Sequence, residues 1–424
     1  MKDILNKFRI LLYNPIIVYL FLIIGISILA IYSAAPLTEL QYGLETNYAI
    51  KQLVFYALGA IVVVVIIVIG NDRVRAMRWG IYGFIMILLF GLFLYKEGIP
   101  IPYAKKATNG AISWYVLPAG IGTFQPSEFM KIAIALVVAD IIQKHNELYP
   151  HLKRTVQTDF QLLLKIMAAI AAPCFLIFEQ PDSGITMIIL FFVAMMIFTS
   201  GIKWRYIFVV GSLLTIVITV FITLVGVFPD FVTDTLGVAP YKLSRFFGWF
   251  DPFGTYISSG YQLSQGLLAI GSGNLVGNGL QSAMTTIPEA HTDFIFAVIG
   301  MDFGLIGTLI TIILCLLFDF EILSTATLNR GHYNSYLCVG IFAMIFFQQI
   351  QNIGMTIGLF PITGVTLPFV SYGGSSSVSY MILFGLVLSA HIEGTKIKHS
   401  EVDYYERTLY LKTKAYIKDN AKVD

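Results

Sequence analysis

The sequence predicts an all-α polytopic membrane protein, one domain over residues 1–424, with about ten transmembrane helices, cytoplasmic termini and a long extracellular loop between spans seven and eight. Of its 424 residues, 57% are hydrophobic and only 12% are charged, whereas roughly one quarter of a soluble domain is charged. The mean hydropathy is +0.78. Apolar runs of about 18 residues or more, long enough to cross roughly 30 Å of hydrocarbon, recur along the chain. These observations exclude a soluble multidomain protein.

The apolar runs define the expected spans. Their approximate bounds are 15–35, 49–70, 78–95, 124–142, 161–178, 185–200, 205–228, 293–317, 336–358 and 376–392. The first run follows a charged stretch and has no small-residue cleavage site at the spacing of a signal peptide. We therefore expect the first span to be retained.

The distribution of Lys and Arg predicts the orientation, because basic loops tend to stay cytoplasmic. With the N-terminus inside, the inner segments contain Lys2, Lys7, Arg9, Arg73, Arg75, Arg78, Lys144, Lys153, Arg154, Lys203, Arg205, Arg330 and seven basic residues from Lys396 to Lys422. The outer loops contain only Lys96, Lys105, Lys106, Lys242 and Arg245. Residues 1–14 and a basic tail, 393–424, are therefore expected in the cytoplasm. This positive face suits anionic lipid headgroups, and no nucleic-acid partner is expected.

Two outer segments, 96–123 and 229–292, are long enough to suggest a functional role. In the second, the stretch "YQLSQGLLAIGSG" has apolar residues at helical spacing, which predicts a short helix along the membrane surface. The glycines from Gly271 to Gly279 permit tight turns. We expect a wall or lid of an outward-facing site. The alternative is a simple linker, since "GSGNLVGNG" does not have the spacing of a phosphate-binding loop.

Two charged residues fall near the start of the fourth expected span, in "FQPSEFMKIAIALV". Charges within spans are costly, by roughly 2.5–3.5 kcal/mol at a helix centre, and often have functional or paired roles. Pro126 and Ser127 suit a helix start, with Ser127 as its cap. Glu128 and Lys131 then lie on one helical face. They form either a structural ion pair or a site in which Glu128 orients Lys131 toward an anionic headgroup.

A second polar group, "PEAHTD", precedes the eighth expected span. A helix dipole favours Asp293 in the first turn, so capping alone could explain this residue. However, Glu289, His291 and Asp293 lie within five residues beside the long outer loop. The group could therefore include a general base, although its spacing names no substrate.

Further polar stretches also map to the outer half of the chain. They are "EQPDSG", Glu179–Gly184, and "LPFVSYGGSSS", Leu367–Ser377, of which the second suits broken or re-entrant backbone. We expect a polar cavity that opens outward. Cys174, Cys315 and Cys338 fall inside expected spans, which favours buried packing over a disulfide framework or a zinc site.

Five stretches of the chain resemble the SEDS family (shape, elongation, division and sporulation), which includes RodA, FtsW and SpoVE. In family order they are "FQPSEFMKIAIALV", "QPDSG", "GYQLSQGLLAIGSGNLVGNGL", "PEAHTDFIFAVIG" and "GLFPITGVTLPFVSYGGSSS". The resemblance implies a peptidoglycan glycosyltransferase that polymerises lipid II on the outer face of a bacterial cytoplasmic membrane. The "GWFDPF" form and the short termini look most like RodA of Gram-positive bacteria.

The resemblance also implies site residues and partners. Asp293 matches the essential acidic residue, Trp114 matches a Trp needed for activity, and Glu128 with Lys131 matches a charged pair. The further candidates for substrate binding are Arg245, Gln262, His291, Ser371 and Ser375. A Mg²⁺ or Mn²⁺ cofactor is a family-level expectation. The expected partners are lipid II, a class B penicillin-binding protein with transpeptidase activity, and other elongasome or divisome membrane proteins.

The implied substrate suggests a mechanism. Forming a β-1,4 bond from an α-linked diphosphate donor requires inversion, by in-line attack of an acceptor 4-hydroxyl. Asp293 would take the proton, orient the hydroxyl or hold a cation, and Lys131, Arg245 or a divalent cation would stabilise the leaving diphosphate. The alternatives are a lipid II flippase or other transporter, which a polytopic layout also accommodates, and a structural scaffold of the division or elongation machinery.

Overall fold

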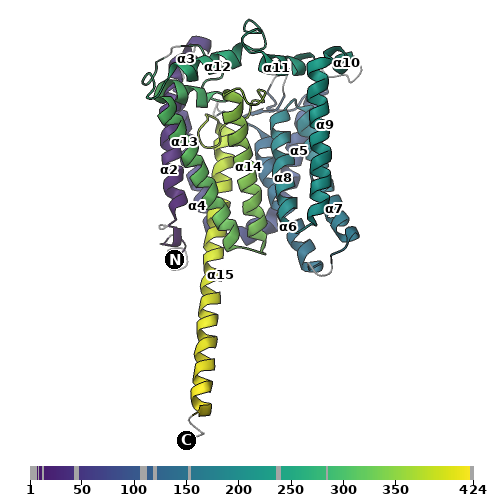
Figure 1. Cartoon of the computed structure of the whole chain (residues 1–424), viewed down its shortest axis with the longest axis vertical. Helices are drawn as coiled ribbons and strands as arrows, with labels where there is room; N and C mark the ends of the chain where they lie inside the picture. The colour runs from purple at the N-terminus through teal and green to yellow at the C-terminus, as the bar shows by residue number, and fades with distance from the viewer. Residues whose placement is uncertain are drawn as a thin grey trace.

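The computed structural model shows a bundle of long helices with short helices lying across one of its ends (Figure 1). The structure describes residues 7, 9–11, 14–42, 47–105, 112–117, 122–150, 154–234, 240–282 and 285–420. Of the basic residues used to predict orientation, Lys2, Lys106, Lys153 and Lys422 lie outside these ranges. The start of α2 lies at the end of the bundle opposite the short helices, and the last helix extends beyond the bundle at that same end (Figure 1).

A long helix overlaps each expected span. These helices are α2 (Pro15–Ser33), α4 (Tyr48–Ile69), α5 (Asn71–Lys96), α6 (Pro126–Leu148), α7 (Val156–Glu179), α8 (Ser183–Thr199), α9 (Trp204–Val227), α13 (Ile295–Leu328), α14 (Tyr333–Thr356) and α15 (Gly374–Asn420). In the described part of the chain, seven helices are long and apolar enough to cross a membrane, and α8 is a shorter apolar helix. The predicted fold class is therefore confirmed, whereas the number of spans and their orientation stay predictions.

The helices differ in how deeply they are buried. In the most apolar windows of α14 and α15, 72% of the residues are buried, compared with 17% for α5. Helix α6 is also central, because every residue of Ala133–Ala139 is at most 1% exposed. Helices α6, α14 and α15 thus form the centre of the bundle, and α5 presents most of its surface outward. The three cysteines are free, as predicted, and lie in α7, α13 and α14.

The short elements gather at one end of the bundle (Figure 1). They are the helices α3 (Ala35–Tyr42), α10 (Pro229–Asp234), α11 (Pro240–Phe250) and α12 (Tyr261–Ser272), and the antiparallel strands β1 (Tyr115–Val116) and β2 (Thr123–Phe124). Helix α12 confirms the short helix predicted from "YQLSQGLLAIGSG". The predicted glycine turn follows it: Gly277 has a φ of 84°, and a Cβ atom there would lie 2.1 Å from the Asp302 carbonyl oxygen.

The segment between α14 and α15, 357–373, has irregular backbone. The irregular backbone predicted for 367–377 is confirmed for 367–373, whereas 374–377 form the start of α15. Side chains from two other helices satisfy its polar groups. Tyr56 Oη donates to the Phe369 carbonyl oxygen at 2.7 Å, and Ser27 Oγ donates to the Val370 carbonyl oxygen at 2.8 Å. Buried irregular backbone is stable only with such partners. The segment is therefore a fixed part of the bundle.

Candidate active site

A cavity of about 1080 Å³ lies at the end of the bundle that holds the short elements. It is lined by residues from α4, α6, α8, α11, α12, α14 and α15 and from the loops between them. In the described part of the chain, its charged lining residues are Lys51, Glu128, Asp182, Arg245, Glu289 and Asp293. Polar stretches far apart in the sequence thus meet in one cavity, as predicted. Carboxylates outnumber cations in its wall.

Asp293 does not cap α13, contrary to one of the two explanations drawn from the sequence. The helix begins at Ile295 with Phe294 as its N-cap, and no acidic residue lies in its first turn. Asn352 holds the Asp293 backbone in place, because its Nδ2 atom donates to the carbonyl oxygens of Asp293 at 2.8 Å and of Val365 at 2.7 Å. Asp293 is therefore fixed to the irregular segment, and its carboxyl group is available at the cavity.

The environment of Asp293 shifts its acidity. The pKa of its carboxyl group is raised from 3.8 to about 7, mainly by burial and next by the charge of Glu289, while Arg245 opposes the shift. Gly364 also lies close to the carboxyl group of Asp293: a Cβ atom at Gly364 would stand 3.4 Å from Asp293 Oδ2, and φ there is 73°. This position favours glycine, because an L side chain there would be strained and would crowd the carboxylate. Near neutral pH, Asp293 can both accept and release a proton.

Asp182 is a second carboxylate in the cavity wall, and it was not among the residues predicted for the site. It is the N-cap of α8, and its Oδ1 atom accepts from the Ile185 backbone N–H at 3.3 Å. Its Oδ2 atom accepts from Gln125 Nε2 at 2.9 Å and from Ser127 Oγ at 3.2 Å. Burial raises its pKa from 3.8 to about 6. The sequence signal was an Asp-Ser-Gly directly before an apolar run, which indicates a cap but not a cavity.

The bond from Ser127 to Asp182 corrects a prediction about α6. The helix has Pro126 in its first turn and Gln125 as its N-cap, without a capping side-chain hydrogen bond. Ser127 is therefore inside the helix and does not cap it. Its hydroxyl group instead connects the start of α6 to the start of α8.

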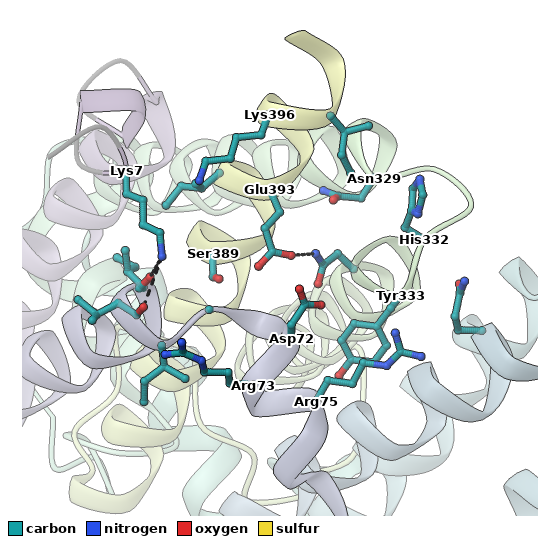
Figure 2. A pocket seen from close by; sticks show the side chains of 18 of the residues that line it. Lys7, Asp72, Arg73, Arg75, Asn329, His332, Tyr333, Ser389, Glu393 and Lys396 are labelled. Atoms are coloured by element: carbon teal, nitrogen blue, oxygen red, sulfur yellow. Dashed lines mark hydrogen bonds between the residues drawn. The ribbon is translucent and has the colours of Figure 1, made fainter. Parts of the chain in front are cut away.

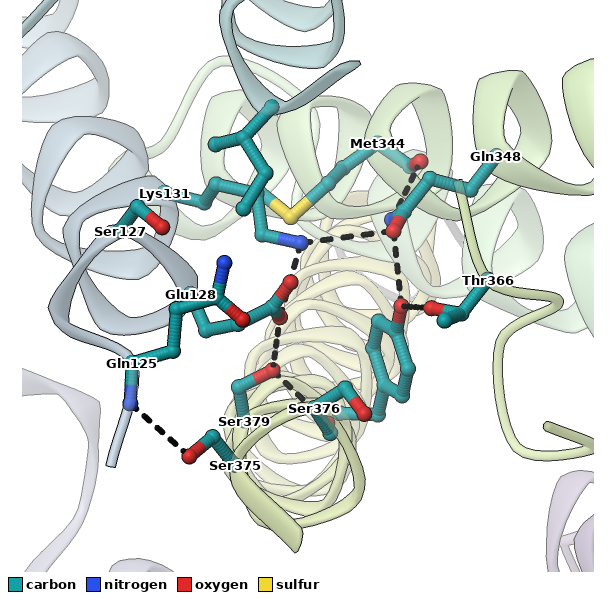
Figure 3. A network of polar contacts seen from close by, with 12 residues as sticks. Gln125, Ser127, Glu128, Lys131, Met344, Gln348, Thr366, Ser375, Ser376 and Ser379 are labelled. Carbon is teal, nitrogen blue, oxygen red and sulfur yellow. Dashed lines mark hydrogen bonds and ion pairs between the residues drawn. The ribbon is translucent and has the colours of Figure 1, made fainter. Parts of the chain in front are cut away.

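Glu128 and Lys131 form a buried ion pair, with 3.0 Å between Lys131 Nζ and Glu128 Oε2 (Figure 3). Ser379 Oγ donates to the same carboxylate oxygen at 3.0 Å. Lys131 Nζ also donates to Gln348 Oε1 at 3.4 Å, which in turn accepts from Tyr380 Oη at 2.7 Å. Helices α6, α14 and α15 are thus joined by one polar network in the centre of the bundle.

Only one member of this ion pair faces the cavity. Glu128 and Gln348 line it, whereas Lys131 does not and has 0% exposed surface. The idea that Lys131 contacts a headgroup directly is therefore not supported by this arrangement. The geometry is that of a structural ion pair, in which Lys131 neutralises the charge of Glu128 from the side away from the cavity.

The other candidate residues divide into two groups. Trp114, Arg245, Gln262 and Ser375 line the cavity. Ser375 is also used structurally, since its hydroxyl group accepts from the Gln125 N–H and donates to the Thr123 carbonyl oxygen, each at 3.0 Å. The part played by these four residues in substrate binding stays a prediction.

His291 and Ser371 are not among the residues that line the described cavity, and their part in substrate binding stays a prediction. Ser371 Oγ accepts from the Leu367 N–H at 2.8 Å and donates to the Thr292 carbonyl oxygen at 2.7 Å. The His291 ring lies 4.5 Å from the ring of Tyr48, centroid to centroid. Ser371 therefore holds the backbone next to Asp293 in place. Burial lowers the pKa of His291.

A divalent cation has no complete protein site among the described residues, because no group of three or more His, Cys, Asp or Glu could hold one there. The donor set of the cavity therefore does not fit a cage built of side chains alone. Mg²⁺ is often held by one or two carboxylates together with the phosphate oxygens of a substrate. Within the described cavity, a cation would need such oxygens from a ligand.

Comparisons with known proteins agree with this geometry. A family model described as "Cell cycle protein", covering FtsW, RodA and SpoVE, matches residues 14–396. The probable peptidoglycan glycosyltransferases FtsW of Thiomicrospira cyclica and of Lactococcus lactis subsp. lactis are 30% and 31% identical to this chain. These matches cover 90% and 91% of this chain, and 92% and 94% of those proteins. The assignment to RodA within the family stays a prediction.

Two solved structures share the fold. One chain belongs to the study "Structural coordination of polymerization and crosslinking by a peptidoglycan synthase complex", with a TM-score of 0.70 over 89% of this chain and 97% of that chain. The other is the rod shape determining protein RodA of Thermus thermophilus, with a TM-score of 0.59 over 89% and 95%. Each is 23% identical in sequence. This chain therefore belongs to the SEDS family of FtsW, RodA and SpoVE, a family of multi-pass proteins of the bacterial plasma membrane.

Proposed function

We propose that this protein is a peptidoglycan glycosyltransferase that polymerises lipid II into glycan strands on the outer face of the membrane, during cell elongation and shape maintenance. The observation that carries the proposal is Asp293, a carboxylate with a pKa of about 7 in the wall of a polar cavity at one end of the bundle. The names of the similar proteins, probable peptidoglycan glycosyltransferases, support the same reaction. The assignment to elongation rests on the resemblance to RodA alone.

Asp293 is the proposed general base. An acceptor sugar hydroxyl attacks the anomeric carbon of an α-linked diphosphate donor, so the glycosidic bond forms as the bond to the diphosphate breaks. The carboxylate accepts the hydroxyl proton as this occurs. A base is most effective when its pKa lies near the working pH, and burial gives Asp293 that property.

Two cations are proposed to bind the diphosphate. Lys51 and Arg245 line the cavity, in contrast to the buried Lys131. On α4, beside Lys51, the lining residues Ile50, Val54 and Leu58 are 58%, 52% and 45% exposed. An apolar carrier chain in the membrane could lie along these side chains while its diphosphate reaches Lys51. Preorganised cations of this kind stabilise the charge that develops on a leaving group.

The function is tested with purified protein and lipid II alone, in detergent. We expect glycan strands, and we expect the rate to rise with pH through about 7, because the deprotonated fraction of Asp293 rises over that range. The measurement is the length distribution of labelled strands between about pH 5.5 and 8.5, a range that brackets this pKa. Translocation of lipid II without polymer would support a flippase, and an inactive protein that only assembles with partners would support a scaffold.

The flippase alternative is not favoured by the packing of the bundle. A lipid headgroup that crosses the membrane needs a polar route through the middle of the protein. The middle of α6, Ala133–Ala139, is instead apolar and fully packed. The polar lining of the candidate site stays at one end.

Replacing Lys51 by Gln is expected to reduce the rate of polymerisation about tenfold to a hundredfold, because a charged hydrogen bond to a diphosphate contributes roughly 1.5–3 kcal/mol. Lys51→Arg should keep most of the activity, since the charge is retained. Lys96→Gln is the matched control, because Lys96 pairs with Glu179 outside the cavity. Equal effects of Lys51→Gln and Lys96→Gln on initial rates would contradict the assignment.

Two further expectations belong to this proposal. A class B penicillin-binding protein is proposed as partner, and the similarity to a chain of a peptidoglycan synthase complex supports it. Other elongasome or divisome membrane proteins are proposed as partners on the resemblance alone. A Mg²⁺ or Mn²⁺ ion is also proposed on the resemblance, with Asp293 as a carboxylate ligand. Undiminished activity in excess chelator would remove the ion from the proposal.

A further inference from the structure

A second cavity, of about 700 Å³ (Figure 2), is lined by the end of α4 and the starts of α5 and α14, and so lies at the opposite end of the bundle from the candidate active site. This is the end that the Lys and Arg pattern assigns to the cytoplasm. Its charged lining residues, within the described part of the chain, are Lys7, Asp72, Arg73, Arg75, Glu147, Glu393 and Lys396, together with His332. Nothing in the proposed reaction uses this cavity.

Two of these charged residues form the fixed wall of the cavity. Glu393 accepts from the Asn71 backbone N–H at 3.2 Å and from Asn334 Nδ2 at 2.5 Å, so the carboxylate is bound at the N-terminus of α5. Arg75 donates to Asp140 at 2.8 Å through its Nε atom. These contacts hold α5, α6, α14 and α15 together.

Three further cations come from separate segments of the chain. Lys7 precedes α2, Arg73 lies in the first turn of α5, and Lys396 lies on α15. In Figure 2 they surround the same side of the cavity, away from Tyr333 and His332. Lys7 Nζ donates to the Ile67 carbonyl oxygen at 3.0 Å, at the end of α4, which anchors this lysine at the rim. Cations brought together from distant segments suit an anionic ligand.

A buried amide points to a second property of the ligand. Asn329 is 0% exposed, and its Nδ2 atom donates to the carbonyl oxygens of Thr325 and Ala390, each at 3.0 Å. Its Oδ1 atom has no hydrogen-bond partner among the described residues, and Asn329 lines the cavity. A buried acceptor left without a donor is costly. The site therefore suits a ligand that offers a hydroxyl group.

One edge of the cavity is apolar. Val68 and Ile69, at the end of α4, line it and are 40% and 36% exposed on the surface of the bundle. A lipid bound at this edge would place its acyl chains on these residues and its headgroup among the cations. A small soluble anion would make no use of this apolar edge.

We propose that this cavity binds the headgroup of an anionic phospholipid of the inner leaflet, with its phosphate at Lys7, Arg73 and Lys396 and a headgroup hydroxyl donating to Asn329 Oδ1. Phosphatidylglycerol has both features. Bound in this way, the lipid links the N-terminal segment, α5 and α15. The proposal does not depend on the proposed glycosyltransferase activity.

The test compares two charge-matched triple variants of the full chain. Lys7→Gln/Arg73→Gln/Lys396→Gln removes the proposed phosphate contacts. Lys203→Gln/Arg205→Gln/Arg330→Gln removes three cations expected on the same side that do not line the cavity. Native mass spectrometry in detergent measures the dissociation constant for phosphatidylglycerol. We expect about a hundredfold weaker binding for the first variant, from about fivefold per basic residue, and little change for the second.

Several outcomes would overturn the proposal. Equal losses in the two triple variants would show general charge attraction. Equal affinity of the wild-type protein for phosphatidylmethanol, which is anionic but lacks the hydroxyl group, would remove the contact to Asn329. Displacement of phosphatidylglycerol by millimolar inorganic phosphate would point to a soluble anion. If the first triple variant does not fold, the single variant Arg73→Gln replaces it, because Arg73 is exposed and its substitution should not disturb the fold. A smaller loss of affinity for phosphatidylglycerol is then expected.

Discussion

Replacing Asp293 by Asn is expected to reduce lipid II polymerisation by about 10²- to 10⁴-fold, the usual contribution of a general base. Asparagine has nearly the same shape but accepts no proton in this pH range, so raising the pH should not restore the rate. The Asp293 carbonyl oxygen would still accept from Asn352, so the fold should be retained. The measurement is the initial rate of strand formation, together with thermal unfolding in detergent.

A control for this variant is available on the same side of the protein. Asp251 is exposed, does not line the cavity, and uses its Oδ1 atom to accept from the Gly254 N–H. Asp251→Asn should therefore change the rate by no more than about twofold, as expected of a surface substitution. A folded Asp293→Asn variant that polymerises lipid II at an unreduced rate would show that the proton leaves by another route.

Much of the architecture could be predicted from the sequence because the signals are local. Each long apolar run produced a helix, and the helical spacing in "YQLSQGLLAIGSG" produced α12. The Pro, Gly and Ser content of "LPFVSYGGSSS" predicted irregular backbone, which was found for residues 367–373, whereas residues 374–377 begin α15. Composition and periodicity indicate which residues of a segment face water and which face lipid or protein. These features could therefore be predicted without knowing how the helices are arranged.

The composition of the candidate site depended on packing and was less predictable. His291 and Ser371 were selected as substrate-binding residues, but the His291 ring packs against the ring of Tyr48, and the Ser371 hydroxyl group donates to the Thr292 carbonyl oxygen. Asp182 and Lys51 were overlooked, because nothing local distinguishes a cap or an interfacial lysine from a cavity wall. The direction in which a side chain points is set by which helices become neighbours, and a single sequence does not report it.

Replacing Glu128 by Gln is expected to destabilise the protein strongly, because it leaves the ammonium group of Lys131 buried without a counter-charge. Breaking a buried ion pair from one side typically costs about 3–5 kcal/mol. Lys131 has no exposed surface and its only other hydrogen-bond acceptor is Gln348, within the described contacts. The unfolding temperature in detergent should fall markedly, and the yield of monodisperse protein with it.

The matched control breaks an exposed pair. Glu179→Gln removes the partner of Lys96, at 2.7 Å, in a pair whose side chains are each 34% exposed, and exposed pairs contribute about 0–1 kcal/mol. The double variant Glu128→Gln/Lys131→Met should recover most of the lost stability, since no charge is then left unpaired. Recovery of stability without recovery of activity would separate the two roles of Glu128, as counter-charge for Lys131 and as part of the cavity wall. Equal unfolding temperatures for Glu128→Gln and Glu179→Gln would instead mean that water reaches Lys131, and that this lysine can meet the substrate after all.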